Sequence, residues 1–383
     1  MKRHLFHRFI IVIVRYTVAP VIKRIMRYSC RKQKGPVKPS IIISNHNTNL
    51  DPVLIALSFS RHMYFIASEH VFRKGFKSRL LRFFLQPIPI DKTKNDVFSI
   101  KDMLNRLKSG ASVCLFAEGD RSFNGTTGPI PLSTAKLVRR SGADLITFRL
   151  EGGYFTEPRW GKNQRKGKMA GCFINRYTAE ELKSIPAEQV ASLIERDIYE
   201  DAYERQKAKL IRFKGKKLAE NIETALYLCP GCERIGTIQS KGDSFFCDCG
   251  LEATFTELGL LKGETLPFST IKKWDEWQFE KLGEIIDAAG DEPICTDEGQ
   301  SLYMVNRAKK SSIVGTGVME MRRDAFHCAG RVFPIKHITR FTIVDRMTLV
   351  FALADGVSYE VRSQVPRSAL KYREIFRILI NRN

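Results

Sequence analysis

Between residues 39 and 150, short apolar segments alternate with segments of helical periodicity, and this alternation limits the possible folds most. Strands are predicted for the apolar runs at residues 39–44, 62–67, 112–117 and 144–150. Helices are predicted from residue 51, around 76–85, at 95–108 and at 132–140. Strands alternating with helices indicate an α/β domain with a mostly parallel sheet flanked by helices, which we place at residues 37–190.

Three further regions follow that domain. Residues 191–224 are charge-rich and largely helical in pattern, which predicts a helical linker. Residues 225–258 contain a cysteine cluster. Residues 262–383 begin with a helical stretch near 269–289, continue from residue 317 as short alternating strands and end in a helix. This last pattern resembles a pleckstrin-homology-type β-rich domain, and we expect it to bind an unidentified protein or lipid.

The first 36 residues predict a basic, apolar arm. The net charge is +22, and residues 1–50 hold 11 Lys or Arg and no Asp or Glu. The apolar run from Phe9 to Val14 has six residues, whereas a membrane-spanning helix needs about 20. The mixture favours a helix lying in the headgroup layer of an anionic membrane, although a core helix with a basic outer face fits too. The predicted apolar contacts are Phe6, Phe9, Ile10, Ile13 and Val14.

The first polar motif is SNHNTNLDP, which directly follows the apolar run at residues 41–43. It places His46 at the carboxyl edge of the predicted sheet, where ligands of open α/β folds bind, five residues before Asp51. A neutral imidazole can take a proton from an alcohol, and a carboxylate bound to its other nitrogen fixes the tautomer. The spacing alone equally allows a turn histidine followed by a carboxylate that caps a helix.

The second polar motif is FAEGDRS, at the end of the apolar run 112–117. Arg121 offers a planar fork of donors for a phosphate or carboxylate, and Gly119 allows close approach of the backbone to a ligand. By itself, such a segment is more often a surface turn.

Together, the two motifs resemble those of the glycerolipid acyltransferase family, the lysophosphatidate and glycerol-phosphate acyltransferases. That family carries N-H-x-x-x-x-D followed by E-G-T-R-S, and NHNTNLD and EGDRS stand here in that order and at the family's separation. The resemblance covers roughly residues 35–190. It implies that His46 is the general base and Asp51 its partner. It also implies that the acyl acceptor is held by Glu118, Gly119, Arg121 and Ser122.

Three departures from the family pattern affect the acceptor. Asp120 stands where the family has Thr, and a carboxylate beside Arg121 would weaken an anion site. Lys92, in PIPIDK, stands in the place of an Arg of the acceptor site and supplies a point charge. The segment LITFRLEGGY lacks the family's proline, and Arg149 and Glu151 there are expected to reshape the acceptor pocket.

The resemblance implies transfer of a fatty acyl group from acyl-CoA or acyl-carrier protein to a hydroxyl of a lysophospholipid or glycerol phosphate, as in phospholipid biosynthesis. It places the enzyme at the cytoplasmic face of the cell membrane. A different lipid or polar acceptor remains an alternative, as does an acyltransferase-like scaffold without activity. A zinc-ribbon nucleic-acid-binding protein would also fit the net charge. Against nucleic acid, the excess charge lies in the apolar arm, and residues 225–258 are nearly charge-balanced.

The cysteine cluster has the spacing of a metal site. CPGC and CDCG give C-x2-C and C-x-C, and four thiolates on two tight turns predict a structural zinc site. A pair of disulfides is the alternative, which a reducing compartment would disfavour. The predicted ligands are Cys229, Cys232, Cys247 and Cys249.

Overall fold

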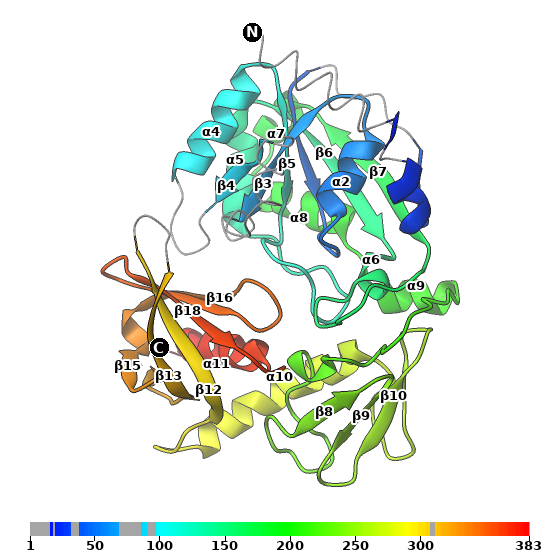
Figure 1. Cartoon of the computed structure of the whole chain (residues 1–383). Helices are drawn as coiled ribbons and strands as arrows, with labels where there is room; N and C mark the ends of the chain where they lie inside the picture. The colour runs from blue at the N-terminus through cyan, green and yellow to red at the C-terminus, as the bar shows by residue number, and fades with distance from the viewer. Residues whose placement is uncertain are drawn as a thin grey trace. The chain divides into compact units, whose positions relative to one another are not determined.

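A computed structural model gives the fold of residues 16–17, 20–31, 38–68, 86–90, 97–306 and 311–382. The chain divides into two compact units (Figure 1). The described residues up to 159 and residues 164–215 form the first unit, and residues 160–163 with 216–382 form the second. The apolar residues predicted for the arm, the segment 76–85 and Lys92 lie outside the described residues.

The first unit is built on a seven-stranded sheet in the order β1-β7-β6-β2-β5-β3-β4. Only the pair β6–β7 is antiparallel, so the predicted mostly parallel sheet is confirmed. The strands are β1 (Tyr28–Cys30), β2 (Ser40–Ser44), β3 (Met63–Ser68), β4 (Ile88–Ile90), β5 (Ser112–Phe116), β6 (Asp144–Glu151) and β7 (Met169–Tyr177).

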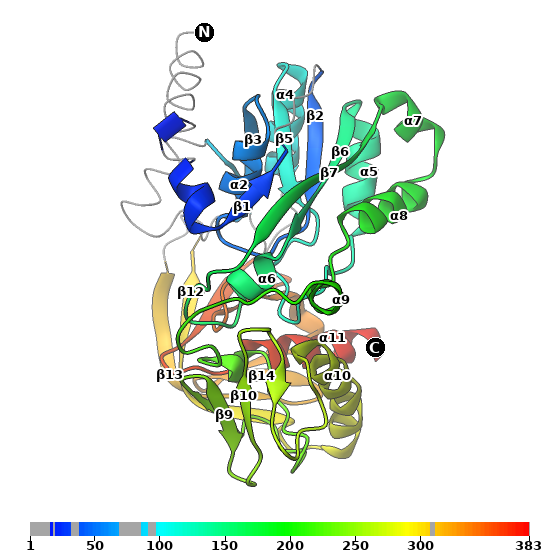
Figure 2. The ribbon, with the colours of Figure 1, turned by 90° about the vertical axis from the view of Figure 1, so that its right-hand side faces the viewer.

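Helices flank both faces of this sheet (Figure 2). The helices are α2 (Asp51–Ser58), α4 (Val97–Lys108), α5 (Leu132–Ser141), α6 (Gly153–Thr156), α7 (Ala179–Ser184), α8 (Ala187–Ile198) and α9 (Ala202–Ala208). Alternate residues of β2 point to opposite faces: Ile41 and Ile43 pack with α4, α5 and α8, whereas Ile42 packs with α2. Strand β2 is therefore buried on both faces, and its carboxyl end carries the first motif.

Helix α8 differs from the sequence-based division of the chain, which assigned most of it to a linker. Its residues Val190, Ile194 and Ile198 are fully buried in the same core as β2 and β5. A helix with such an apolar stripe is a layer of the domain. A linker segment without regular helix follows α9, up to a 3₁₀ turn at Ile222–Thr224.

The second unit begins with a small antiparallel sheet in the order β11-β10-β9-β8. Its strands are β8 (Ile238–Lys241), β9 (Ser244–Cys247), β10 (Glu252–Phe255) and β11 (Leu261–Lys262). Helix α10 (Ile271–Ala288) follows, close to the predicted helical stretch.

A second seven-stranded sheet, antiparallel throughout, completes this unit in the order β15-β14-β13-β12-β18-β17-β16. The strands are β12 (Cys295–Val305), β13 (Ser311–Met321), β14 (Ala325–Cys328), β15 (Arg331–Pro334), β16 (Ile338–Ile343), β17 (Leu349–Leu353) and β18 (Ser358–Ser363). A 3₁₀ turn at Ile335–His337 precedes β16, and helix α11 (Ala369–Arg382) ends the unit. The β-rich character is thus confirmed, whereas the pleckstrin-homology-type identity stays a prediction.

Within the described residues, no helix is long and apolar enough to cross a bilayer.

Candidate functional site

The first motif forms a loop in which His46 and Asp51 are hydrogen-bonded. The His46 Nδ1 lies 2.9 Å from Asp51 Oδ2. Asp51 is fully buried, whereas the His46 side chain keeps 22% of its surface exposed. Because Nδ1 is turned to the carboxylate, Nε2 is the nitrogen that remains for a substrate.

Asp51 is held in place by the loop itself. Its Oδ2 accepts hydrogen bonds from the backbone N–H groups of Asn47 (2.6 Å) and Thr48 (2.8 Å), and its Oδ1 accepts one from the Thr48 hydroxyl (2.6 Å). Helix α2 begins at Asp51 with Leu50 as the N-cap residue, and no side chain caps it. The carboxylate therefore orients the loop and the imidazole, and the helix-cap reading of Asp51 is wrong.

Two neighbours fix the position of the histidine. The ring of Phe116, at the end of β5, stacks on the His46 ring with 4.1 Å between centroids and 17° between planes. The backbone N–H of His46 donates to Glu118 Oε1 (2.8 Å), and the N–H of Gly128 donates to Glu118 Oε2 (2.8 Å). Burial raises the pKa of the Glu118 carboxyl to about 8, although both N–H donors act to lower it. Glu118 thus ties the two motifs together.

Arg121 makes an ion pair with a residue that sequence analysis did not single out. Its Nη1 lies 3.0 Å from Glu157 Oε1, and the side chains are only 14% and 12% exposed. The same carboxylate accepts from the side-chain amides of Asn49 and, at 3.0 Å, Gln164. Glu157 therefore joins the loop of the first motif to Arg121 in the second.

Asp120 has its own cation, so it does not neutralise Arg121 as the sequence suggested. Its Oδ2 lies 2.5 Å from Arg159 Nη1, and the Arg159 side chain is only 3% exposed. Arg159 also donates to the backbone carbonyl of Arg121 (3.0 Å) and lies over the Phe123 ring at 4.3 Å. Arg159 therefore holds two consecutive residues of the second motif, one through its side chain and one through its backbone.

The other two predicted acceptor residues shape the turn. Gly119 has a φ of +70°, in the left-handed region that glycine adopts without strain. The Ser122 hydroxyl accepts from the N–H of Gly125 (2.8 Å) and donates to Asn124 Oδ1 (3.2 Å).

The two charged residues that replace the family's apolar segment are also paired. Arg149 and Glu151 pair with each other at 3.2 Å, and Glu151 also pairs with Arg205 of α9 at 2.7 Å.

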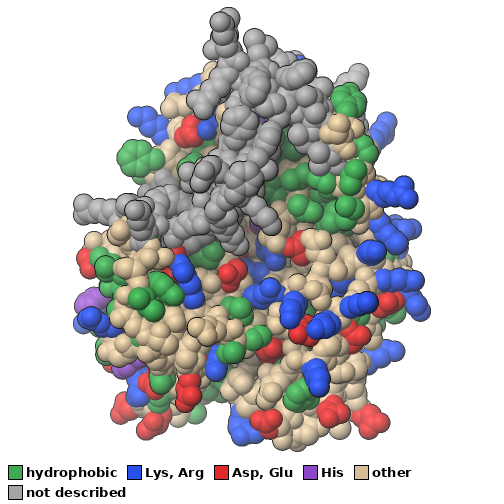
Figure 3. Space-filling model, viewed as in Figure 1, with side chains coloured by type: hydrophobic (Ala, Val, Ile, Leu, Met, Phe, Trp, Pro, Cys, Tyr) green, Lys and Arg blue, Asp and Glu red, His purple; other side chains and the backbone are tan. Residues whose placement is uncertain are grey.

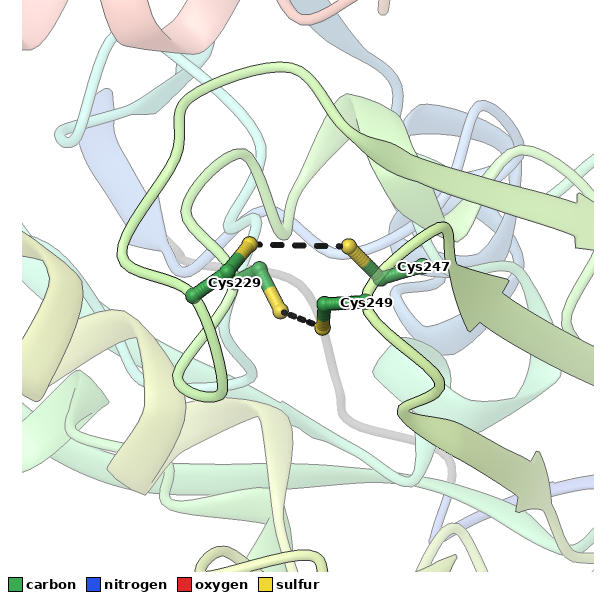
Figure 4. A group of neighbouring side chains, drawn as sticks. Cys229, Cys247 and Cys249 are labelled. Atoms are coloured by element: carbon green, nitrogen blue, oxygen red, sulfur yellow. Dashed lines mark hydrogen bonds between the residues drawn. The ribbon is translucent and has the colours of Figure 1, made fainter.

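The cysteine cluster forms a second candidate centre, in the other unit. The four sulfur atoms of Cys229, Cys232, Cys247 and Cys249 all lie within 4.8 Å of one another. The closest contacts are 3.6 Å between Cys229 and Cys249 and 3.8 Å between Cys232 and Cys247. Figure 4 shows the sulfur atoms of the three labelled cysteines turned toward a common point from two loops.

Those distances match a tetrahedral thiolate site. A metal–sulfur distance of about 2.3 Å in a tetrahedron places sulfur atoms about 3.8 Å apart, whereas a disulfide needs about 2.05 Å. All nine cysteines are free thiols in this structure. The N–H of Gly231 also donates to the Cys229 sulfur at 3.4 Å, and this donor opposes the burial that raises the pKa of that thiol. The donor set therefore fits a metal ion, and the disulfide alternative loses its support.

Buried side chains of α10 hold the segment that leads into this cluster. Gln278 accepts from the N–H of Tyr227 (3.0 Å) and donates to the carbonyl of Ala225 (2.9 Å). The indole N–H of Trp274 donates to the carbonyl of Leu228, next to Cys229, at 2.8 Å. Both side chains are fully buried, so the first cysteine loop is fixed to the helix.

Comparisons with known proteins agree with the motif analysis. Residues 27–151 match a family model described as Acyltransferase. The chain is also similar to a crystal structure of the 1-acyl-sn-glycerophosphate (LPA) acyltransferase PlsC from Thermotoga maritima. The identity is 18%, the TM-score is 0.43, and the match covers 54% of this chain and 83% of the other. The residues that match the family model include both motifs, so the match falls on the segment from which the resemblance was predicted.

Proposed function

We propose that this protein transfers a fatty acyl group from acyl-CoA or acyl-carrier protein to a hydroxyl of a lipid acceptor, a lysophospholipid or glycerol phosphate. The supporting observation is the hydrogen-bonded pair of His46 and buried Asp51 at the carboxyl edge of the sheet, inside the segment that matches the acyltransferase family. A carboxylate-oriented imidazole is well suited to act as a general base for a hydroxyl.

In the proposed reaction, Asp51 holds the proton of His46 on Nδ1, so Nε2 is free to act as the base. Nε2 takes the proton of the acceptor hydroxyl while the oxygen attacks the thioester carbonyl. The C–O bond forms, the C–S bond breaks, and the imidazolium returns the proton to the leaving thiolate. Because the thioester is already activated, the reaction needs no covalent acyl-enzyme.

An acceptor without a phosphate is the second candidate. One specific observation favours it: Arg121 is already paired with Glu157, and Asp120 is paired with Arg159. These two cations and two carboxylates sum to zero charge, so they offer no net attraction for an anion. Transfer to another lipid or polar acceptor is therefore the alternative to transfer to a phosphate-bearing acceptor.

We propose that the arm docks the enzyme on the cytoplasmic face of the membrane. The described part of the arm exposes apolar side chains at Tyr16, Val21 and Ile25. The N–H of Met169 donates to the Arg27 carbonyl, so the arm runs onto β7, where the neighbouring Lys168 is exposed. On the face of the molecule that Figure 3 draws, Lys and Arg side chains gather in the region of β7 and α9. Apolar and basic groups together suit an anionic lipid surface.

Tyr28–Cys30 of the predicted arm form strand β1 of the sheet and Met26 is buried in its core, so deletion of residues 1–25 tests this docking. The truncated protein is expected to leave anionic liposomes and to lose activity on membrane-embedded acceptor, while it keeps activity on a soluble short-chain analogue. Complete sedimentation of the truncated protein with the liposomes would place the anchor elsewhere, with the C-terminal domain as the next candidate.

The metal at the four cysteines is proposed to be zinc, in a structural role. Four protein ligands fill a tetrahedral shell, so a bound zinc has no open position for a substrate. It would join the two cysteine loops and supply no chemistry to acyl transfer.

The experiment that tests the function is a transfer assay. Purified protein is incubated with labelled acyl-CoA, or with acyl-carrier protein, and a panel of lysolipids, glycerol phosphate and neutral acceptors. A new acylated product supports the proposal and identifies the acceptor. Absence of product with every pair of donor and acceptor, together with tight salt-sensitive binding of nucleic acid, would favour the nucleic-acid-binding alternative.

A further inference from the structure

Glu157 pairs with one nitrogen of the Arg121 guanidinium, the group that the motif pattern assigns to the acceptor. The carboxylate lies 3.0 Å from Arg121 Nη1 and receives two amide donors besides, from Asn49 and Gln164. The pair is largely shielded from water, because only 14% of the Arg121 side chain and 12% of the Glu157 side chain are exposed. An ion pair in such surroundings is screened much less than one on the surface.

Within the described residues, Arg159 does not compensate for this pairing. Arg159 is committed to Asp120 at 2.5 Å and to the Arg121 carbonyl at 3.0 Å. A phosphate that binds the remaining nitrogens of Arg121 would lie beside the Glu157 carboxylate on Nη1, and two anions would share one cation. Like charges at such a distance repel each other strongly where water is scarce.

We propose that Glu157 is a specificity-determining residue of the acceptor site, which competes with the acceptor's phosphate for Arg121. The site accordingly prefers acceptors whose headgroup carries little negative charge near the reacting hydroxyl, a neutral glyceride or a phosphodiester, over a phosphate monoester. This inference rests on the proposed acyl transfer and narrows its acceptors to neutral and phosphodiester headgroups, at the expense of glycerol phosphate and lysophosphatidate.

The preference follows from a difference between two binding free energies. A neutral acceptor leaves the Arg121–Glu157 pair intact, and its hydroxyls can donate to the carboxylate or accept from the guanidinium. A phosphate monoester either displaces Glu157 or binds against its charge. Specificity of this kind comes from a repulsive group as much as from an attractive one.

Replacing Glu157 with Gln removes the charge and keeps the shape. The side-chain oxygen that remains in the Glu157→Gln variant can still accept from Asn49, while Arg121 becomes available to an anion. A charge-assisted hydrogen bond is worth about 1.5–3 kcal/mol, so the variant is expected to favour phosphate-bearing acceptors by about 10- to 100-fold. Asp144→Asn is the matched control. Asp144 pairs with Arg176 at 2.6 Å at the amino end of β6, the opposite edge of the sheet from His46.

The experiment uses the full chain and two soluble acceptors of equal chain length, a short-chain lysophosphatidate and the corresponding monoacylglycerol. For wild type, Glu157→Gln, Asp144→Asn and the double variant Arg121→Gln/Glu157→Gln, kcat/KM is measured on both acceptors. Calorimetry measures binding of both acceptors without a donor, and thermal unfolding verifies the fold. The expected result is a rise of about tenfold or more in the phosphate-to-neutral ratio for Glu157→Gln. The control should leave the ratio unchanged, and the double variant should lose the rise.

Equal changes on both acceptors in a folded Glu157→Gln protein would overturn the inference and leave Glu157 as a purely structural residue. A rise that persists in the double variant would also overturn it, because the effect would not pass through Arg121. If wild type transfers no acyl group but Glu157→Gln binds lysophosphatidate more tightly, the proposed reaction fails and the charge competition stands. If wild type transfers the acyl group and Glu157→Gln does not change the phosphate-to-neutral ratio, the proposed reaction stands and the charge competition fails.

Discussion

The two candidate centres of this chain use their charged groups in opposite ways. In the first unit, Arg121 and Asp120 each have a partner of opposite charge from the segment 157–159. In the second unit, four cysteine sulfur atoms lie within 4.8 Å of one another, so the same kind of donor is gathered around one point. The charges of the first centre are neutralised by other side chains, whereas four thiolates of the second centre would be stable only around a bound cation.

This difference bears on what each centre does. A site whose charges are already paired acts on a substrate through orientation, as Asp51 orients His46, and through selective repulsion. A site of converging thiolates obtains its binding energy from the metal, and that energy stabilises the fold. Variants that separate these two behaviours test the comparison.

The largest effect is expected at the cysteine centre. Replacing Cys229 and Cys232 by Ser should abolish binding of about one zinc equivalent per chain, because a two-thiolate remnant cannot form the tetrahedral shell. Apparent zinc binding energies of such sites are about 10–16 kcal/mol, so the first cysteine loop should lose its protection from hydrogen exchange. The N–H groups of Tyr227 and Cys229 report this most directly, because they donate to Gln278 and to the Arg234 carbonyl at the start of this loop. A metal-free wild-type protein with four titratable thiols in this region would refute the site.

The next largest effect is expected at Asp51. Asp51→Asn keeps the size of the side chain and can keep an oxygen where both backbone N–H groups donate, but it removes the negative charge. A neutral amide no longer stabilises the imidazolium that forms when His46 takes the proton, so kcat should fall about 10²- to 10⁴-fold. Thermal unfolding should show a moderate loss of stability. An unchanged kcat would mean that Asp51 serves the loop alone.

A smaller, pH-dependent effect is expected at Glu118. Burial raises its pKa to about 8 from an ordinary value of 4.5, so the folded state binds a proton there that the unfolded state has released. The contribution of Glu118 to the free energy of unfolding is therefore full below pH 4.5 and declines as the pH rises toward about 8.

Glu118→Gln should remove that slope from the pH profile of denaturant unfolding. Above a pH of about 8, where the ionised Glu118 accepts from the N–H groups of both His46 and Gly128, the variant should also be less stable by about 1–3 kcal/mol, because one amide oxygen cannot accept from both. Identical pH profiles for wild type and Glu118→Gln would contradict the raised pKa.

Site residues that lie close together in the sequence could be predicted, whereas residues that only the fold brings to the site could not. His46 and Asp51 share one loop, and the four cysteines sit on two short turns, so their spacing carries the signal. Glu157 and Arg159 lie in TEPRW, which has no periodicity and no match to either motif. The acidic and basic residues flanking the proline were the only available hint, and a hint of that kind is common on surfaces.

The same distinction holds for the fold. Strands β2, β3, β5 and β6 of the first sheet were predicted because residues buried on both faces give continuous apolar runs. Strands β1, β4 and β7, toward the two edges of the sheet, were not predicted. Strand β12 was missed, because its sequence begins with the polar segment TDEGQS and its register shifts between Asp297 and Gln300. Gly299, with a φ of +66°, allows that bulge. Tertiary pairing with β13 and β18 supplies what the local pattern lacks.

The central claim is that His46 is the base of an acyl transfer carried out by the first unit, and a single substitution tests it. The rate of transfer from labelled acyl-CoA to the acceptor identified in the panel is measured for wild type and His46→Ala under identical conditions. The imidazole is partly exposed, so its loss should leave the fold and the thermal unfolding midpoint nearly unchanged. The account predicts a fall of about 10²- to 10⁴-fold in the rate. Full activity in a folded His46→Ala protein would contradict it.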